Sequence, residues 1–360
     1  MYSHITRPIN FTLVVDDFGI KYRNREDVEH LLTALRELFE ITVDWTGSKY
    51  LGITLRFDST RRTVSLSIPD YIRKALLRFA PHLLHGAASP MLYVPPVYGP
   101  PIAPSPSTAR PLTPQELLLV QQIVGVFLFY ARCVDPTMLT AVNAISSEMK
   151  TPTTVLLDAC NRLLAYDASY PNNELVFTAS DMTLFIQSDA SYLGRSLARS
   201  VAGGCFYLGT NHFPTHINGS VTAVSNTIDV VVASAFEAEY GAVFITAQIG
   251  VWLRTILSAL GYPQPPTILL CDNECAVGIA NDTTKLRKGK AIDMRFHWIR
   301  DRISQSQFQV LWRKGANNLA DFFTKALPVH THQSLMPFLV HTPLDPNNKY
   351  HSKRVKRSIV

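Results

Sequence analysis

Acidic residues at the ends of predicted strands and the starts of predicted helices are the parts of this sequence best suited to chemistry. Asp189 ends the strand in "DMTLFIQSDASY", and Asp272 ends the buried strand "TILLCDN". Glu239 lies in the first turns of a long predicted helix, and Asp321 in the first turn of the last predicted helix. In an open α/β sheet, strand ends and adjoining helices converge on one crevice. We therefore expect these four side chains to meet.

Four carboxylates in one place repel one another unless a cation neutralises them. Hard oxygen ligands suit magnesium or manganese. Two such ions about 3.5–4 Å apart can hold the attacking and leaving oxygens of a phosphodiester displacement, so no side-chain nucleophile is needed. A single aspartate after a strand is most often a turn former or a helix cap. The prediction of two Mg²⁺ or Mn²⁺ ions therefore depends on the whole set of four.

The elements that must position these residues form a mixed α/β unit, which we place at residues 179–327. Its hydrophobic pattern predicts the order β-β-β-α-β-α-α-β-α, with the long helix ended by Gly261. Five strands in this order predict a mixed five-stranded sheet with helices, an α/β (α+β) fold.

Proline marks a boundary upstream of this unit. Nine prolines between residues 90 and 114 forbid a helix or a central strand. We therefore expect a first unit at 1–89, built of a strand, a helix, a hairpin and a second helix. A proline-rich connector with two buried helices follows at 90–178. After 328 the chain becomes polar and ends in basic residues, which predicts a disordered basic tail over 328–360.

The composition limits the class of protein. A formal net charge of +6 and a pI near 9.0 favour polyanionic partners. Five widely spaced cysteines lack the paired spacing of a zinc site, which favours a reducing compartment. We expect an intracellular protein, and the cysteines do not distinguish a cytoplasmic particle from the nucleus. The most apolar window, 117–131, is interrupted by Gln121 and Gln122 and falls short of the roughly 20 residues of a membrane span. We expect a soluble protein without a membrane partner.

Several motifs, in order, carry a resemblance to a known family. The segments "QSDASY", "SAFEAEYGAVF", "LLCDNECAVGIAND", "KGKAIDMRFHWIRDRI" and "NLADFFTKAL" resemble successive motifs of the RNase H domain of copia-type retrotransposon polyproteins. "VVDDFGIKY" and "KYLGITL" resemble the YxDD-type box of their reverse transcriptase and the hairpin that follows it. The resemblance extends to about Leu327 and implies the C-terminal part of such a polyprotein, with an RNase H-like sheet.

The resemblance also implies roles for the acidic residues. Asp189, Glu239, Asp272 and Asp321 match the Asp-Glu-Asp-Asp set that binds two magnesium ions, which implies cleavage of the RNA strand of an RNA–DNA hybrid by a metal-activated water. Glu237 competes with Glu239, since the two lie about 200° apart on a helix and only one can face the site. Glu239 fits the family's helix start better. Integrase-type transposases, whose glutamate comes last, are a poorer match.

The same resemblance implies that Asp16 and Asp17 are half of a polymerase metal site, held at the turn of a palm hairpin. A polymerase also needs a third carboxylate from an earlier strand, which would lie upstream of Met1. We therefore expect a partial palm and thumb at 1–89 and no independent DNA polymerase activity, unless the missing upstream polyprotein portion is supplied separately. The competing hypothesis is a catalytically inactive remnant that at most binds nucleic acid.

Basic residues surround the last two predicted helices. The segment from Asn281 to Lys325 contains ten basic residues and four acidic ones, with Trp298 and Trp312 among them. Such a surface suits a phosphate backbone bound without sequence preference, although a solvated helix face with a core tryptophan explains Trp298 equally well. The residues expected to contact nucleic acid are Lys285, Arg287, Lys288, Lys290, Arg295 and Arg313.

Overall fold

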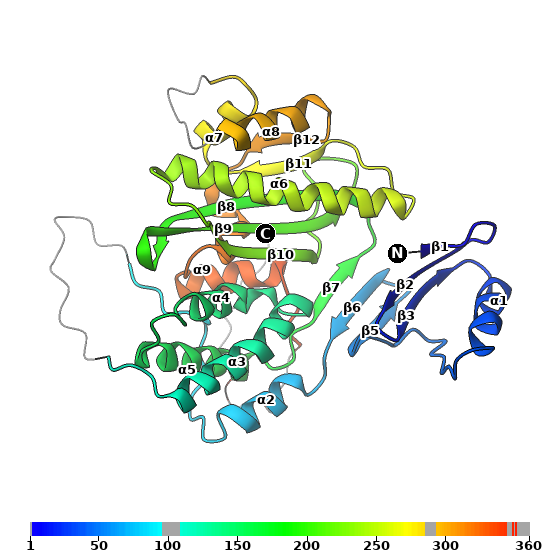
Figure 1. Cartoon of the computed structure of the whole chain (residues 1–360), viewed down its shortest axis with the longest axis horizontal. Coiled ribbons are helices and arrows are strands. Elements are labelled where there is room, and N and C mark those ends of the chain that lie inside the picture. The colour runs from blue at the N-terminus through cyan, green and yellow to red at the C-terminus, as the bar shows by residue number, and fades with distance from the viewer. Residues whose placement is uncertain (1, 96–108, 285–292, 344–347, 349, 351–360) are drawn as a thin grey trace.

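The computed structural model of the chain describes residues 2–95, 109–284, 293–343, 348 and 350. Its central feature is a five-stranded mixed sheet in the order β10-β9-β8-β11-β12 (Figure 1). The strands are β8 (Thr183–Arg195), β9 (Arg199–Gly209), β10 (Ser220–Thr227), β11 (Thr267–Cys271) and β12 (Phe308–Trp312). β8, β9 and β10 are antiparallel, whereas β11 runs parallel to both β8 and β12. This is the RNase H-like arrangement predicted from the sequence.

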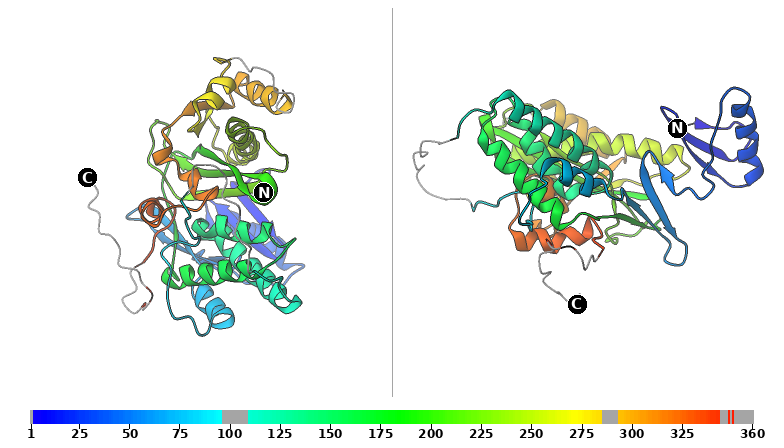
Figure 2. Two further views of the ribbon diagram at one scale, coloured as in Figure 1. Left: turned by 90° about the vertical axis from the view of Figure 1, so that its left-hand side faces the viewer. Right: turned by 90° about the horizontal axis from the view of Figure 1, so that it is seen from below.

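The two faces of this sheet have different covers. Successive side chains of β8 point to opposite faces of the sheet. Leu184 and Ile186 pack in an apolar core with residues of α6 (Ala235–Ala259), whereas Phe185 packs in a separate apolar core on the other face. That face receives η4 (Leu319–Phe323) and the helical layer (Figures 1 and 2). Two shorter helices, α7 (Glu274–Ala280) and α8 (Asp293–Ser304), lie between β11 and β12 in the chain.

Capping determines where α6 begins and ends. The side chain of the N-cap residue Ser234 accepts a hydrogen bond from the backbone N–H of Glu237, and the Glu237 carboxylate accepts one from the N–H of Ala233. At the other end Gly261 takes a φ of +89°, which suits glycine and ends the helix as the sequence predicted.

A helical layer packs beneath the sheet. Its elements are α2 (Tyr71–Phe79), α3 (Pro114–Cys133), η1 (Pro136–Met138), α4 (Leu139–Ser147), α5 (Thr154–Ser169), α9 (Val329–Leu335) and η5 (Met336–Phe338). The sequence did not predict α4, and it predicted disorder from residue 328. That prediction is wrong for the described part of the tail, because Met336, Leu339 and Val340 are buried in the core of this layer. The basic end of the tail obscured this apolar segment.

The N-terminal part forms two small sheets (Figures 1 and 2). The first contains β1 (Tyr2–Ser3), β2 (Ile9–Val14) and β3 (Asp17–Tyr22), followed by α1 (Arg25–Arg36). The second contains β4 (Lys49–Tyr50), β5 (Ile53–Asp58), β6 (Thr63–Ser67) and β7 (Leu175–Thr178). The segment expected to be one strand is thus a hairpin. Because β7 pairs with β6, residues just before the five-stranded sheet complete the N-terminal sheet. The boundaries at 89, 178 and 327 stay predictions.

Two described helices, α3 and α6, are long and apolar enough to cross a membrane if length and composition alone are counted. α3 has 20 residues, more than the apolar window recognised in the sequence. In each helix 33% of the most apolar window is buried within the fold. Core helices of water-soluble proteins meet the same criterion, so the finding is weak evidence for a membrane protein.

Candidate active site

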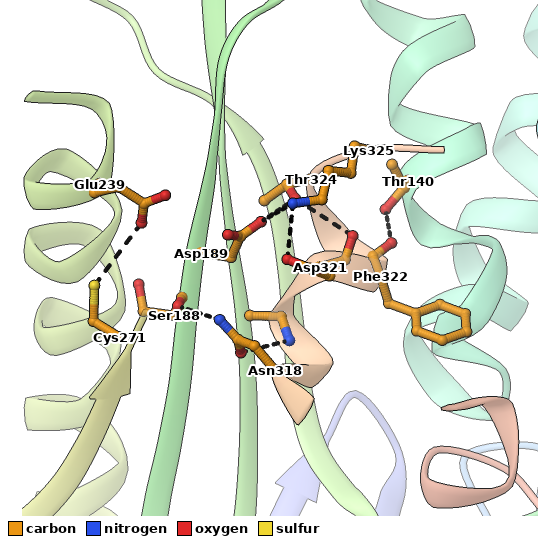
Figure 3. A network of polar contacts seen from close by, with 11 residues as sticks. Thr140, Ser188, Asp189, Glu239, Cys271, Asn318, Asp321, Phe322, Thr324 and Lys325 are labelled. Carbon is orange, nitrogen blue, oxygen red and sulfur yellow. Dashed lines mark hydrogen bonds and ion pairs between the residues drawn. The ribbon is translucent and has the colours of Figure 1, made fainter. Parts of the chain in front are cut away.

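The structure brings the four predicted acidic residues together. Carboxylate oxygens of Asp189, Asp272 and Asp321 all lie within 4.8 Å of one another. Glu239 approaches from α6 and forms a second group, on the same distance criterion, with Asp272 and the thiol of Cys271 (Figure 3). Asp272 belongs to both groups, so the four acidic side chains form one continuous cluster. The cluster lies beside the C-terminal end of β11, which Asp272 follows directly.

Asp189 lies in the middle of β8, not at the end of its strand as the sequence predicted, because β8 continues to Arg195 in its pairing with β9. The alternation of side chains along β8 directs it. Asp189 shares the η4 face of the strand with Gln187, whose side-chain carbonyl accepts a hydrogen bond of 2.7 Å from the backbone N–H of Leu319. The amide of Asn318 donates to the carbonyl of Ser188 at 2.9 Å. These two bonds fix the start of η4 on β8 and so carry Asp321 to Asp189.

Gly203 makes this close approach possible. It lies opposite Asp189 in the β8–β9 register. A Cβ atom at this position would lie 2.5 Å from Cγ2 of Thr324 and 2.8 Å from the carbonyl oxygen of Ala320. Only a residue without a side chain therefore lets η4 contact the sheet here, which is a common reason for glycine inside a strand.

Asp321 lies in a 3₁₀ helix, not at the start of a final α-helix as the sequence predicted. η4 spans only Leu319–Phe323, capped by the side chain of Asn318, and tertiary bonds hold it. The hydroxyl of Thr140 in α4 donates to the carbonyl of Phe322, and the hydroxyl of Thr324 donates to Asp189 (Figure 3). The helical layer therefore supports the site directly.

The structure also distinguishes the two glutamates of α6. Glu237 caps the helix, as described above. Glu239 is 9% exposed, and its Oε2 lies 3.9 Å from Sγ of Cys271. Only Glu239 of the pair joins the cluster, as expected for two residues that lie on different faces of one helix.

Asp272 is held at the end of β11 by its backbone. Its carbonyl accepts a 3.0 Å hydrogen bond from Nε1 of Trp312, whose side chain is 48% exposed. A Cβ atom at Gly315 would lie 2.6 Å from Oδ2 of Asp272, so glycine leaves room for this carboxylate. Both neighbours follow from the parallel pairing of β11 with β12, which places residues after the two strands side by side.

A lysine that the sequence reasoning did not single out lies inside the cluster. Nζ of Lys325 is 2.9 Å from Oδ1 of Asp321 and 3.5 Å from Oδ2 of Asp189 (Figure 3). Lysine four residues after an aspartate is too common a spacing to have suggested this contact.

Burial and mutual repulsion raise the pKa values of Asp189, Glu239 and Asp272. Burial, followed by the charge of Asp321, raises the pKa of Asp189 to about 8. Burial, followed by the charge of Asp189, raises the pKa of Glu239 to about 9. Burial also raises the pKa of Asp272, whereas Lys325 lowers that of all three acids. Lys325 thus offsets part of the repulsion among the carboxylates, and a bound proton or metal ion would offset more of it.

The paired aspartates near the N-terminus lie in a different setting. Asp16 occupies the turn between β2 and β3, Asp17 begins β3, and both are exposed. Within residues 2–95, 109–284 and 293–343, neither belongs to a group of three or more potential metal ligands. The described structure thus supplies these two carboxylates without a third.

The residues expected to bind nucleic acid differ in their surroundings. Lys285, Arg287, Lys288 and Lys290 lie outside the described residues. Arg295 is half-buried, with its guanidinium 5.6 Å from the ring centre of Phe244 on α6, so packing accounts for it. Arg313 follows β12 directly and is half-buried next to exposed Trp312. Trp298 packs edge-on against Phe244, which favours a core role for that tryptophan.

The known proteins that resemble this chain in sequence include polyproteins of transposons. No family model matches the chain. The Pol polyprotein of transposon TNT 1-94 from Nicotiana tabacum is 25% identical over 323 residues, 88% of this chain and 23% of the relative. That of transposon RE2 from Arabidopsis thaliana is 28% identical over 329 residues, 89% of this chain and 21% of the relative. This chain is similar to retrovirus-related Pol polyproteins of transposons. It spans less than a quarter of the length of these two relatives.

Solved structures give a weaker comparison. The N-terminal RNase H domain of rv2228c from Mycobacterium tuberculosis aligns with a TM-score of 0.29 at 17% identity, covering 40% of this chain and 91% of that one. LC11-RNase H1 in complex with an RNA/DNA hybrid aligns with a TM-score of 0.29 at 14% identity, covering 39% and 93%. The fold assignment therefore depends on the strand order and directions described above.

Proposed function

We propose that this chain is a retroelement-derived RNase H that cleaves the RNA strand of RNA–DNA hybrids by metal-dependent hydrolysis. The observation that carries the proposal is the convergence of Asp189, Asp272 and Asp321 within 4.8 Å, with Glu239 joining through Asp272. Four carboxylates from four separate elements meet at the end of an RNase H-like sheet. Similarity to transposon Pol polyproteins supports the retroelement origin.

The donor set fits a hard divalent cation. The four acidic side chains offer carboxylate oxygens, which suit Mg²⁺ and also Mn²⁺. Asp189, Glu239, Asp272 and Asp321 would hold two such ions. When bound, the ions would activate the attacking water and neutralise charge on the leaving oxygen. The raised pKa values of Asp189 and Glu239 are consistent with carboxylates that a bound cation would help to ionise.

The residues around the carboxylates contribute orientation. Thr324 donates to Asp189, while Asn318 and Gln187 fix the 3₁₀ helix that presents Asp321. Ligands held in fixed positions need little reorganisation when charge develops on the substrate. Exposed Trp312 and its neighbour Arg313 lie at the rim, where a sugar ring and a phosphate of a bound hybrid would be accommodated.

We also propose a place within a longer polyprotein. The motif order supports a copia-type element, with the chain containing the reverse transcriptase active-site box and the region that follows it. Asp16 and Asp17 would then derive from a polymerase. We expect no DNA synthesis by this chain alone, because two exposed carboxylates cannot align a primer hydroxyl and a nucleotide without a third ligand.

The competing function is an inactive remnant that binds nucleic acid without cleaving it. The two are separated by incubating the full chain with MgCl₂ and an RNA–DNA hybrid whose RNA strand is labelled. Cleavage by the wild-type chain, lost in Asp272→Asn, supports the nuclease. Retention of the hybrid without cleavage would support the remnant.

A further inference from the structure

Lys325 places a positive charge among the proposed metal ligands. Its ammonium lies 2.9 Å from Oδ1 of Asp321 and 3.5 Å from Oδ2 of Asp189 (Figure 3). These carboxylates, with Asp272, are the three whose oxygens lie within 4.8 Å of one another. The lysine therefore contacts two of the three groups that would surround a divalent ion.

An ammonium and a metal ion cannot use the same carboxylate lone pairs at the same time. A protonated lysine has three N–H donors and no lone pair, so it cannot bind a metal ion. Its positive charge would repel a divalent ion bound to the same two carboxylates. We propose that Lys325 is an internal cation that occupies part of the metal site and must withdraw before a divalent ion binds Asp189 and Asp321. This inference depends on the proposed function, since it assumes that the cluster is a metal site.

The surroundings indicate that the lysine moves and the carboxylates stay. The side chain of Lys325 is 43% exposed, whereas that of Asp189 is 2% exposed and that of Asp321 is 19% exposed. Thr324 donates to Asp189, and the bonds from Asn318 and Leu319 fix the 3₁₀ helix that carries Asp321. Lysine has a flexible four-carbon stem and a strongly hydrated head, so withdrawal toward solvent is available to it.

Withdrawal would leave a free ammonium beside the loaded site. There it could pair with a phosphate of the bound nucleic acid, a contact that lysine makes as a point charge. The same side chain would thus neutralise the empty cluster and then contact the substrate. The alternative is a permanent ion pair that only stabilises the fold and remains in place when metal binds.

The test is a titration of the full chain with MgCl₂ by isothermal calorimetry. Lys325→Met should lower the dissociation constant for Mg²⁺ by about tenfold, which corresponds to about 1.4 kcal/mol. Lys325→Arg, which keeps the charge, should stay within about threefold of wild type. Lys314→Met removes a nearby exposed charge and should also stay within about threefold, since exposed charges are screened.

A second measurement needs no substitution at all. An amine-reactive reagent, read out by mass spectrometry, should label Lys325 several-fold more in saturating MgCl₂ than in EDTA, with unchanged labelling of Lys314. Equal or weaker Mg²⁺ binding by Lys325→Met, or unchanged labelling of Lys325 in a chain that binds Mg²⁺, would overturn the inference. Altered Mg²⁺ affinity without hybrid cleavage would leave the inference standing and refute the proposed nuclease. No Mg²⁺ binding by either protein would refute both.

Discussion

The indole Nε1 of Trp312 donates a hydrogen bond of 3.0 Å to the backbone carbonyl of Asp272. This bond holds a tryptophan that is 48% exposed directly beside the carboxylate cluster. Trp312 is the last residue of β12 and pairs with Cys271, the last residue of β11. The indole ring therefore lies at the edge of the site and not in the core. A ring held in this way offers a stacking surface to a nucleotide at little cost in side-chain entropy.

Trp312→Ala should therefore weaken hybrid binding. Stacking on an aromatic side chain contributes about 1–3 kcal/mol per base, so we expect about a tenfold rise in the dissociation constant. The measurement is fluorescence anisotropy of a labelled hybrid. Every protein compared also carries Asp272→Asn, so that the hybrid is not cleaved during the titration. Trp252→Ala is the matched control, because Trp252 is 72% exposed but lies well along α6, 13 residues beyond Glu239. Equal binding by both alanine variants would contradict a role for Trp312.

Gly315→Ala should disturb one carboxylate and leave the fold intact. The added Cβ would lie 2.6 Å from Oδ2 of Asp272, and that side chain can yield by rotating. We expect at least a tenfold loss of cleavage, since small displacements of a catalytic group are costly, with a melting temperature within about 3 °C of wild type. Gly125→Ala, where nothing lies within 4 Å of the new Cβ, should cleave normally. Normal cleavage by Gly315→Ala would show that Asp272 tolerates the displacement.

Gly203→Ala should do more damage, because its neighbours cannot yield easily. The new Cβ would lie 2.8 Å from the backbone carbonyl of Ala320, so η4 must move off the sheet. Overpacking of this kind costs about 1–3 kcal/mol, and Asp321 would be carried away from Asp189. We expect a lower melting temperature together with at least a hundredfold loss of cleavage. A fully active Gly203→Ala would mean that the close contact between η4 and β9 is not needed.

The free energy of unfolding should fall as the pH rises, because two buried acids of the carboxylate cluster are protonated more readily in the folded state. The pKa values of Asp189 and Glu239 rise from ordinary values of 3.8 and 4.5 to about 8 and about 9 on folding. Their protonated forms are favoured in the folded state, so their contribution to stability is fully present below about pH 4. It is lost as the pH rises through 8 and 9. In EDTA the chain should therefore become less stable between pH 5 and pH 9.

Calorimetry of Asp189→Asn and MgCl₂ addition check this dependence. Asp189→Asn, which stays neutral, should show a smaller fall in melting temperature over the same pH range in EDTA. MgCl₂ should raise the wild-type melting temperature most at the alkaline end, because ligand binding to the ionised cluster replaces the lost protons. A wild-type melting temperature that rises with pH in EDTA would contradict the account of the buried acids.

The sequence predicted what depends on period and spacing. The order of the strands and of the helices between them follows from hydrophobic periodicity. The convergence of the four acidic residues was also predicted, although Asp189 lies in the middle of β8 and Asp321 in a 3₁₀ helix. Helical geometry predicted that only one of Glu237 and Glu239 could face the site, and the resemblance to the family's helix start favoured Glu239. The capping role of Glu237 explains why both glutamates are present.

The hydrophobic pattern predicted a single strand around Asp16, whereas the resemblance to a polymerase palm implied a hairpin turn. The structure has the hairpin, with Val15 and Asp16 as its two-residue turn.

What the sequence did not predict depends on tertiary contact. Lys325 reaches the cluster only because η4 is a short 3₁₀ helix held by hydrogen bonds to β8 and α4. The buried tail residues Met336 and Leu339 find their partners in the helical layer, which no local pattern reveals. One signal was available and was not used: the paired glycines in "VAGGCFYLG", since glycine inside a strand often marks a close approach such as that at Gly203.

The most direct test of the central claim is cleavage of a hybrid by the full chain and four single variants. The substrate is an RNA–DNA duplex labelled on the RNA strand, with the same RNA alone as a control. The account predicts that wild type cleaves only the hybrid, only with MgCl₂ or MnCl₂. It also predicts that Asp189→Asn, Glu239→Gln, Asp272→Asn and Asp321→Asn each lose at least about a hundredfold in rate. Cleavage that persists in EDTA or in Asp272→Asn, or no cleavage by wild type with either ion, would contradict it.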